Sequence, residues 1–264
     1  SCSNTRFINV ESENYDTRIK YIILHFTSED FDESLRLLTT RSARPVSSHY
    51  LISNKNLNQN DIKINIYQLV DEEYRAWHAG VSYWNGERGL NDISIGIEIV
   101  NQSRCSQSIS VLKSYSKLLE KCIFEDYPKE QIDKVIYLIN DIVSRNPRIK
   151  SKNIIGHSDI APDRKIDPGP LFPWKKLYEN GIGAWYEDDD FNYYFDQFLN
   201  NMPTTKTVQS ELLDYGYDIE LTGVVDEQTF EVVRAFQLHF RPQKFDGVID
   251  RETAAIIFAL NKKY

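Results

Sequence analysis

The sequence has no run of about 18 apolar residues, the length that a membrane-spanning helix needs, so we expect no such helix. It also lacks a basic stretch: the 264 residues carry a formal net charge of −8, and the pI is near 5.2. A nucleic-acid partner would require a basic surface, so we expect none. The printed chain shows no signal peptide, and we expect it to be a processed form. Its 41% of hydrophobic residues suffice for the core of a soluble globular protein, which we expect to be a monomer.

One stretch, residues 153 to 174, holds several polar side chains between a short apolar run and a series of prolines. Residues 154 to 156 have the pattern of a buried strand end, so His157 should emerge at the rim of a sheet. The proline after Asp167 restricts that residue to an extended conformation, which predicts a rigidly held carboxylate. Because residues two apart in an extended chain face the same side, Lys165 should project beside Asp167.

A second isoleucine-rich run, which also has the pattern of a buried strand, carries His25 near its end. Together, His25, His157 and Asp167 would give a zinc ion three protein ligands. The fourth position would be left to water, as in catalytic zinc sites. Asp159 and Asp163 are alternatives to Asp167, although neither has its proline-rich flank.

The strand predicted over residues 93 to 100 contains one carboxylate, Glu98, in an otherwise apolar pattern. Burying an unpaired carboxylate costs free energy or raises its pKa, so Glu98 requires either a cationic partner or a place in a cleft. A glutamate with a raised pKa suits the role of general base for hydrolysis at a metal. We favour this catalytic role over a structural salt bridge.

These features together resemble the zinc-dependent N-acetylmuramoyl-L-alanine amidases of the amidase-2 type, which are related to peptidoglycan recognition proteins. The resemblance covers residues 15 to 180. The motifs His-Ser-Asp-Ile-Ala-Pro, Lys-x-Asp-Pro-Gly-Pro and Leu-Phe-Pro-Trp are similar to those of AmiD-type lipoprotein amidases of Gram-negative bacteria. The resemblance implies one zinc per chain, with Glu98 and Lys165 as the catalytic groups.

The activity implied by this resemblance is hydrolysis of the amide bond between N-acetylmuramic acid and L-alanine in peptidoglycan and muropeptides. Whether the 1,6-anhydro form of the sugar is also a substrate stays open. Two alternatives remain: a peptidoglycan-binding protein without catalysis, and a zinc peptidase that acts on the stem peptide. The three candidate ligands and both candidate catalytic groups favour the amidase.

Aromatic and polar residues gather on a predicted loop around Trp77, His78 and Trp84. Aromatic faces suit the apolar faces of sugars and peptides, so these three residues are candidates for substrate binding. His49, within a predicted strand, is a fourth candidate, although a structural role is the more frequent one for a strand histidine. Packing against the core is the alternative for Trp84.

Strands that alternate with amphipathic helices predict an α/β fold over residues 1–180, with a central mixed β-sheet flanked by helices, as the resemblance to the amidase-2 fold also implies. The predicted elements are a helix over 29–44 that begins at an Asp30–Glu33 capping box, hairpin strands over 46–53 and 64–70 joined by an Asn-rich turn over 54–60, and helices that begin at Ser110 and Pro128.

The composition changes after residue 178. Residues 181–202 are rich in acids and aromatics, and we interpret them as a linker. A turn followed by an aspartate and a helix occurs twice in residues 203–264, at 223–229 and at 247–253. With the helix predicted over 208–215, this gives a small all-α domain of three helices, which resembles the peptidoglycan-binding type 1 domain.

The cysteines suggest a location. Cys2 resembles the lipidated cysteine of a bacterial lipoprotein, so we expect a periplasmic protein that contacts the outer membrane only through this lipid. An unmodified cysteine is the alternative. Cys105 and Cys122 remain as an even pair, either as a disulfide or as two free thiols.

Overall fold

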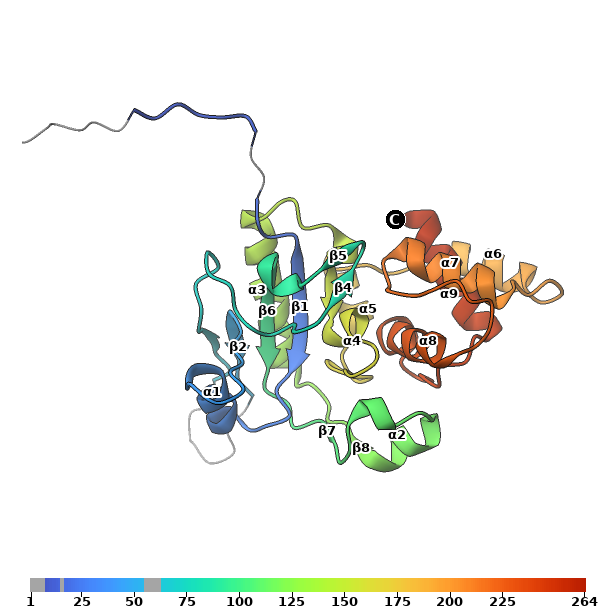
Figure 1. The fold of residues 1–264 in the computed structure, drawn as a ribbon, viewed down its shortest axis with the longest axis horizontal. Helices are drawn as coiled ribbons and strands as arrows, with labels where there is room; N and C mark the ends of the chain where they lie inside the picture. The colour runs from blue at the N-terminus through green and yellow to red at the C-terminus, as the bar shows by residue number, and fades with distance from the viewer. Residues whose placement is uncertain (1–7, 15–16, 55–62) are drawn as a thin grey trace, which may run out of the picture.

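The computed structural model describes residues 8–14, 17–54 and 63–264. Its centre is a five-stranded sheet with the strand order β3-β2-β6-β1-β9 (Figure 1). The strands are β1 (Tyr21–Phe26), β2 (Tyr50–Ile52), β3 (Ile66–Gln68), β6 (Ser94–Ile99) and β9 (Ile154–Gly156). All neighbours in the sheet are parallel except β2 and β3, which are antiparallel. The predicted mixed sheet is therefore confirmed.

The central strands β1 and β6 are apolar because both faces of the sheet are covered. Ile22, Ile23 and Leu24 of β1 and Ile95 and Ile97 of β6 are fully buried. A continuous isoleucine-rich run is the pattern of such a strand, which explains why both strands could be predicted. The ionisable side chains of these strands, His25 and Glu98, come near their carboxyl ends.

Helix α3 (Lys129–Arg145) belongs to the same core as the sheet, through the buried side chains of Ile132, Val135 and Ile139. The side chain of Gln131 donates hydrogen bonds to the backbone oxygens of Ser53 and Val100 and so ties the helix to two strand ends. The structure confirms the predicted start of this helix, because Pro128 is its N-cap.

Helix α1 (Phe31–Thr39) begins as predicted, since the Asp30 side chain accepts a hydrogen bond from the backbone N–H of Glu33. It ends at Thr39, before the predicted end at residue 44, because Thr40 is extended. The residues after Thr40 are mostly polar and exposed, so they have no apolar face that further helical turns could bury.

The helix predicted to begin at Ser110 begins later. Ile109–Val111 form a 3₁₀ turn, η2, and α2 (Tyr115–Lys121) starts after Ser114, whose side chain accepts from the backbone N–H of Lys117. Ile109 and Leu112 of this segment are buried in one cluster with Leu118 of α2. The predicted hairpin is present as β2 and β3, but residues 55–60 of its turn lie outside the described residues.

The two internal cysteines form a disulfide. It joins β7 (Arg104–Cys105) to β8 (Cys122–Ile123), a two-stranded antiparallel ribbon near α2 (Figure 1). Cys2 lies outside the described residues. In the part of the chain that is described, no helix has the length and apolar character to cross a membrane.

The C-terminal part is helical, and its helices lie beside the sheet domain at the right of Figure 1. They are α6 (Asp188–Gln197), α7 (Thr205–Tyr215), α8 (Glu227–Phe240) and α9 (Arg251–Lys263), whereas the preceding helix α5 (Trp174–Glu179) lies next to α4 (His157–Ile160) in the same view. Asp226 and Asp250 cap α8 and α9 through hydrogen bonds from Thr229 and Thr253, as the repeated pattern predicts. Helix α6, within residues 181–202, packs on α9, where the Phe198 and Phe258 rings are 4.9 Å apart.

The C-terminal helices share one hydrophobic core with the sheet domain. Trp84 of the hairpin strand β4 (Tyr83–Trp84) packs edge-on against Tyr215 and Tyr217. Arg234 of α8 is fully buried and donates a hydrogen bond to the backbone oxygen of Pro162. Helix α8 also contacts α4 (His157–Ile160), the short helix that directly follows β9.

Candidate metal centre

The predicted site residues meet at the carboxyl edge of the parallel strands, where open α/β sheets bind their ligands. His25 is the fifth residue of β1, and Glu98 is its register partner in β6, so both side chains leave the same face of the sheet. His157 is the first residue after β9. Asp167 comes from the proline-rich loop.

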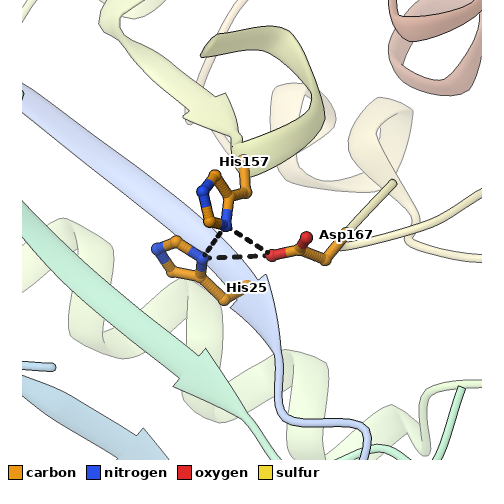
Figure 2. Close-up of side chains that lie close together, drawn as sticks. All are labelled: His25, His157 and Asp167. Atoms are coloured by element: carbon orange, nitrogen blue, oxygen red, sulfur yellow. Dashed lines mark hydrogen bonds and ion pairs between the residues drawn. The ribbon is translucent and has the colours of Figure 1, made fainter. Parts of the chain in front are cut away.

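Three donor atoms form a small triangle (Figure 2). The Nδ1 atoms of His25 and His157 are 2.9 Å apart, and Asp167 Oδ2 lies 3.0 Å from the first and 3.1 Å from the second. Ligands of one tetrahedral zinc ion, bound at about 2.0–2.1 Å, stand about 3.3 Å from one another. The triangle is therefore close to the size that a single ion requires, and all three residues are buried.

The chemistry of the donors also fits a cation. Each of the three atoms has a lone pair that points to the others, and a shared proton can join only two of them. Burial lowers the pKa of His157 to about 4, against the opposing effect of Asp167, so its ring is a neutral ligand at pH 7. Although burial opposes it, the neighbouring His157 and His25 hold the pKa of Asp167 well below its usual range, which keeps it a carboxylate. The group therefore fits a metal site.

The loop that carries Asp167 is fixed against the end of β9. The Asp167 backbone oxygen accepts a hydrogen bond of 2.9 Å from the Ser158 N–H. A Cβ on Gly156 would come within 2.7 Å of the Pro168 ring, so a glycine is needed at this close approach. Asp167 precedes a cis peptide bond to Pro168.

The two alternative carboxylates are elsewhere. Asp159 is buried, and its oxygens accept hydrogen bonds from the Gly156 N–H, the Tyr217 hydroxyl and the His239 ring, at 2.8, 2.6 and 2.8 Å. Asp163 is exposed. Of the five candidate ligands, the structure thus brings together His25, His157 and Asp167.

Glu98 lies beside the triangle with one oxygen unpaired. Its Oε2 atom is buried and has no hydrogen-bond partner among the described residues. Burial raises the pKa of Glu98 to about 7; His25 and Lys165 act against this shift, and Asp167 adds to it. A carboxylate with a pKa near neutrality can both accept and return a proton.

Lys165 faces the same region from the loop. With Asp167 it lines a cavity of about 200 Å³, whose wall also includes Arg104 and Arg164. The Lys165 charge acts to lower the pKa of both Glu98 and Asp167, so its field reaches the centre. The open space next to the triangle is therefore positively charged.

The four candidates for substrate contact have different surroundings. Trp77 is 49% exposed and lines a cavity of about 490 Å³ together with Arg41 and Arg75. Trp84 has no exposed surface, and its indole N–H donates to the backbone oxygen of Lys152. It serves the contact with the C-terminal helices, so the structure contradicts its assignment to substrate binding.

The two histidines among these candidates are also enclosed. His49 is fully buried, its Nδ1 accepts from the Gly96 N–H, and its Nε2 donates to the Tyr74 oxygen. Both ring nitrogens are thus used within the fold, which contradicts a role in substrate contact. His78 is buried too, and its Nδ1 lies 3.0 Å from His25 Nε2. It therefore contacts a candidate metal ligand, a position that the local sequence does not indicate.

Comparison with known proteins identifies two regions. A family described as N-acetylmuramoyl-L-alanine amidase matches residues 15–170, and one described as a putative peptidoglycan binding domain matches residues 201–257. The chain is 42% identical to N-acetylmuramoyl-L-alanine amidase AmiD of Escherichia coli over 248 residues, which are 94% of this chain and 84% of AmiD.

Two solved structures are similar over nearly the whole chain. The crystal structure of AMPDH3 from Pseudomonas aeruginosa in complex with an anhydromuramic pentapeptide has a TM-score of 0.86 and 40% identity, and the match covers 100% of this chain and 98% of that one. The complex of Escherichia coli AmiD with anhydro-N-acetylmuramic acid-L-Ala-D-gamma-Glu-L-Lys has a TM-score of 0.80 and 39% identity, with coverage of 97% and 93%.

Proposed function

Because this chain belongs to the N-acetylmuramoyl-L-alanine amidase family, we propose that it hydrolyses the amide between N-acetylmuramic acid and L-alanine at a zinc ion held by His25, His157 and Asp167. The triangle of buried donors beside an unpaired glutamate carries this proposal. The complexes of the two related enzymes contain anhydromuramic peptides, so we include the 1,6-anhydro sugar among the substrates.

The bound zinc would act as a Lewis acid, which lowers the pKa of water and polarises a carbonyl group. Glu98 would accept the proton of the attacking water and return it to the departing amine of L-alanine. Its buried, unpaired Oε2 atom and its raised pKa support this role. Lys165 would stabilise the negative charge that develops on the carbonyl oxygen.

Mass spectrometry of a muropeptide digest tests the bond that is cut. An amidase releases the intact stem peptide with a free L-alanine amine and leaves the lactyl carboxylate on the sugar. A zinc peptidase would shorten the stem and leave L-alanine on the sugar. A binding protein would leave every mass unchanged, and either of these two results would contradict the proposal.

Lys165→Ala should slow hydrolysis by about 10²-fold, since one donor to a developing oxyanion contributes roughly 3 kcal/mol. The zinc content should stay at one ion per chain, because Lys165 is not a ligand in this proposal. Rates on a soluble anhydromuramyl peptide and metal analysis measure the two effects. Lys175→Ala, on the exposed side of α5, is the matched control and should leave the rate unchanged. An unchanged rate in Lys165→Ala would remove Lys165 from the site.

We propose a catalytic domain over residues 1–180 and a peptidoglycan-binding domain over residues 203–264, joined by residues 181–202. The match to a peptidoglycan binding domain supports the second unit. The shared core and the buried hydrogen bonds from Tyr217 and His239 to Asp159 support a fixed arrangement of the two domains. Asp159 lies two residues after His157, so this contact is close to the metal centre.

A chain that ends at Asn201 should therefore lose more than affinity for the polymer. Removing the C-terminal helices exposes Trp84 and breaks two hydrogen bonds to Asp159, so the melting temperature should fall by about 5 °C or more. Hydrolysis of a small soluble fragment should fall with it. Calorimetry and rates on soluble and polymeric substrates measure this. If the melting temperature were unchanged and hydrolysis fell on intact sacculi alone, the C-terminal domain would instead be a tether.

We also propose that the protein acts in the periplasm as a monomer, held on the outer membrane by a lipid on Cys2. Peptidoglycan as substrate and the Cys105–Cys122 disulfide support an oxidising compartment outside the cytoplasm. Fractionation of cells that express Cys2→Ser tests the anchor: retention of this variant in the membrane fraction would contradict it.

A further inference from the structure

One loop reaches the outer nitrogens of both candidate histidine ligands. His25 uses Nδ1 in the triangle, and its Nε2 lies 3.0 Å from Nδ1 of His78. His157 also uses Nδ1, and its Nε2 lies 3.2 Å from the backbone oxygen of Ala79. His78 through its side chain and Ala79 through its backbone oxygen thus contact the two rings on the side away from the metal centre.

The direction of each hydrogen bond follows from the backbone oxygen at the end of each series, because that oxygen can only accept. A backbone oxygen only accepts, so Nε2 of His157 carries the proton and its Nδ1 is left bare. On the other side, the Ser94 hydroxyl donates to the Leu90 oxygen at 2.6 Å, and the Ser94 oxygen can then accept from Nε2 of His78 at 3.2 Å. His78 therefore presents a bare Nδ1, which accepts the Nε2 proton of His25.

Both chains of hydrogen bonds end with the same result. The Nδ1 atoms of His25 and His157 are free of protons, and these are the atoms that face Asp167. A ligand histidine must offer a bare nitrogen to the metal, and the partner of its other nitrogen selects which one that is. The loop thus determines the tautomer of both rings.

The loop is itself held by one side chain. Asn91, which is buried in the 3₁₀ turn η1 (Leu90–Asp92), accepts hydrogen bonds through Oδ1 from the backbone N–H groups of His78 and Ala79, at 3.0 and 2.8 Å. Strand β6 makes room for the His78 ring, because a Cβ at Gly96 would overlap it. The position of the loop is therefore set from two sides.

We propose that His78 and Ala79, clamped by Asn91, form a positioning unit that prepares both histidines for the metal. This rests on the zinc site proposed above. His78 is a positioning residue, since it contacts His25 and not the reacting atoms. His78 and Ala79 come from the loop between β3 and β4, and Asn91 comes from η1.

Two substitutions of His78 separate positioning from packing. His78→Phe keeps a ring in the cavity and removes the acceptor, so zinc affinity should fall by about 10- to 100-fold, the usual effect of removing the partner of a ligand histidine. His78→Asn places an amide oxygen near the position of Nδ1 and should keep most of the affinity. Competition with a fluorescent chelator measures the dissociation constant for Zn²⁺. The absorption spectrum of the Co²⁺ form reports the ligand geometry, which should change in His78→Phe only.

Further variants keep the test decisive. If His78→Phe melts well below the wild type, Ser94→Ala takes its place, because it frees the His78 tautomer without changing the ring and should weaken Zn²⁺ binding several-fold. Equal affinity in the wild type, in Ser94→Ala and in a folded His78→Phe would overturn the positioning unit. A loss in His78→Asn as large as in His78→Phe would also overturn it. A wild-type chain that binds no Zn²⁺ would instead contradict the proposed function.

Discussion

His25→Ala should release the zinc and reduce hydrolysis of a soluble anhydromuramyl peptide by at least about 10³-fold, because the metal supplies several kcal/mol of transition-state stabilisation. The reason is the geometry of the triangle. His25 Nδ1 is the atom closest to both other donors, at 2.9 and 3.0 Å. Without it, two buried donors remain, which is one fewer than catalytic zinc sites use. Metal analysis of the purified protein should show that the zinc content falls from one ion per chain to nearly none.

Two aspartates of the proline-rich loop extend this experiment. Asp167→Ala should lose zinc as His25→Ala does. Asp163→Ala is the matched control and should keep zinc, because Asp163 is exposed and outside the triangle. Circular dichroism of each variant checks that the fold is retained. Full occupancy in His25→Ala, or loss of zinc in Asp163→Ala, would show that the metal has other ligands.

Glu98→Gln should keep the zinc and lose at least about 10²-fold in turnover, since that is the usual contribution of a general base. The amide has nearly the same shape as the carboxylate but cannot accept the proton of water. The measurement is a rate on the soluble fragment, with metal analysis beside it. Glu87→Gln is the control and should have wild-type turnover, because Glu87 lies in the ribbon strand β5 (Glu87–Arg88), where it is half-buried and paired with Lys20.

The same substitution should raise stability. The pKa of Glu98 is about 7 in the folded chain against an ordinary value of 4.5, so the folded state binds the proton more tightly than the unfolded state. Ionisation of Glu98 therefore disfavours folding at neutral pH, and the disadvantage develops as pH rises from the unfolded value through the folded one. The metal-free Glu98→Gln protein should melt above the metal-free wild type at pH 8, with a smaller difference at pH 4. Near-normal turnover together with a lower melting temperature would indicate a structural Glu98.

The loss of activity and the gain in stability that we expect for Glu98→Gln have one cause. A buried carboxylate oxygen without a partner costs folding free energy, and the same lack of a partner leaves it free to accept a proton from water. Asp159 provides the contrast within this chain. It is fully enclosed, but its oxygens are occupied by three hydrogen bonds, two of which come from Tyr217 and His239 in the C-terminal part of the chain.

Much of the fold and of the candidate site was predictable from local patterns. The isoleucine-rich runs of β1 and β6 and the short run of β9 predict buried parallel strands, because burial on both faces selects apolar residues without alternation. Polar residues at the ends of such runs then meet at one edge of the sheet, which brings His25, Glu98 and His157 together. The helix caps at Asp30, Asp226 and Asp250 were also predictable, because each aspartate binds the backbone N–H of a residue only three positions later.

The tertiary structure decided which aromatic and polar side chains are enclosed. Trp77 and Trp84 belong to one predicted loop, yet Trp84 is the one that packs against Tyr215 and Tyr217, more than a hundred residues later in the chain. The partners of His78 likewise come from two other segments: His25 belongs to β1, and Asn91 and Ser94 belong to the stretch that leads into β6. A strand or a cap depends on near neighbours and can be recognised in a short window of sequence. Burial and hydrogen-bond partners depend on segments that come together only when the chain folds, so the roles of Trp84 and His78 required the structure.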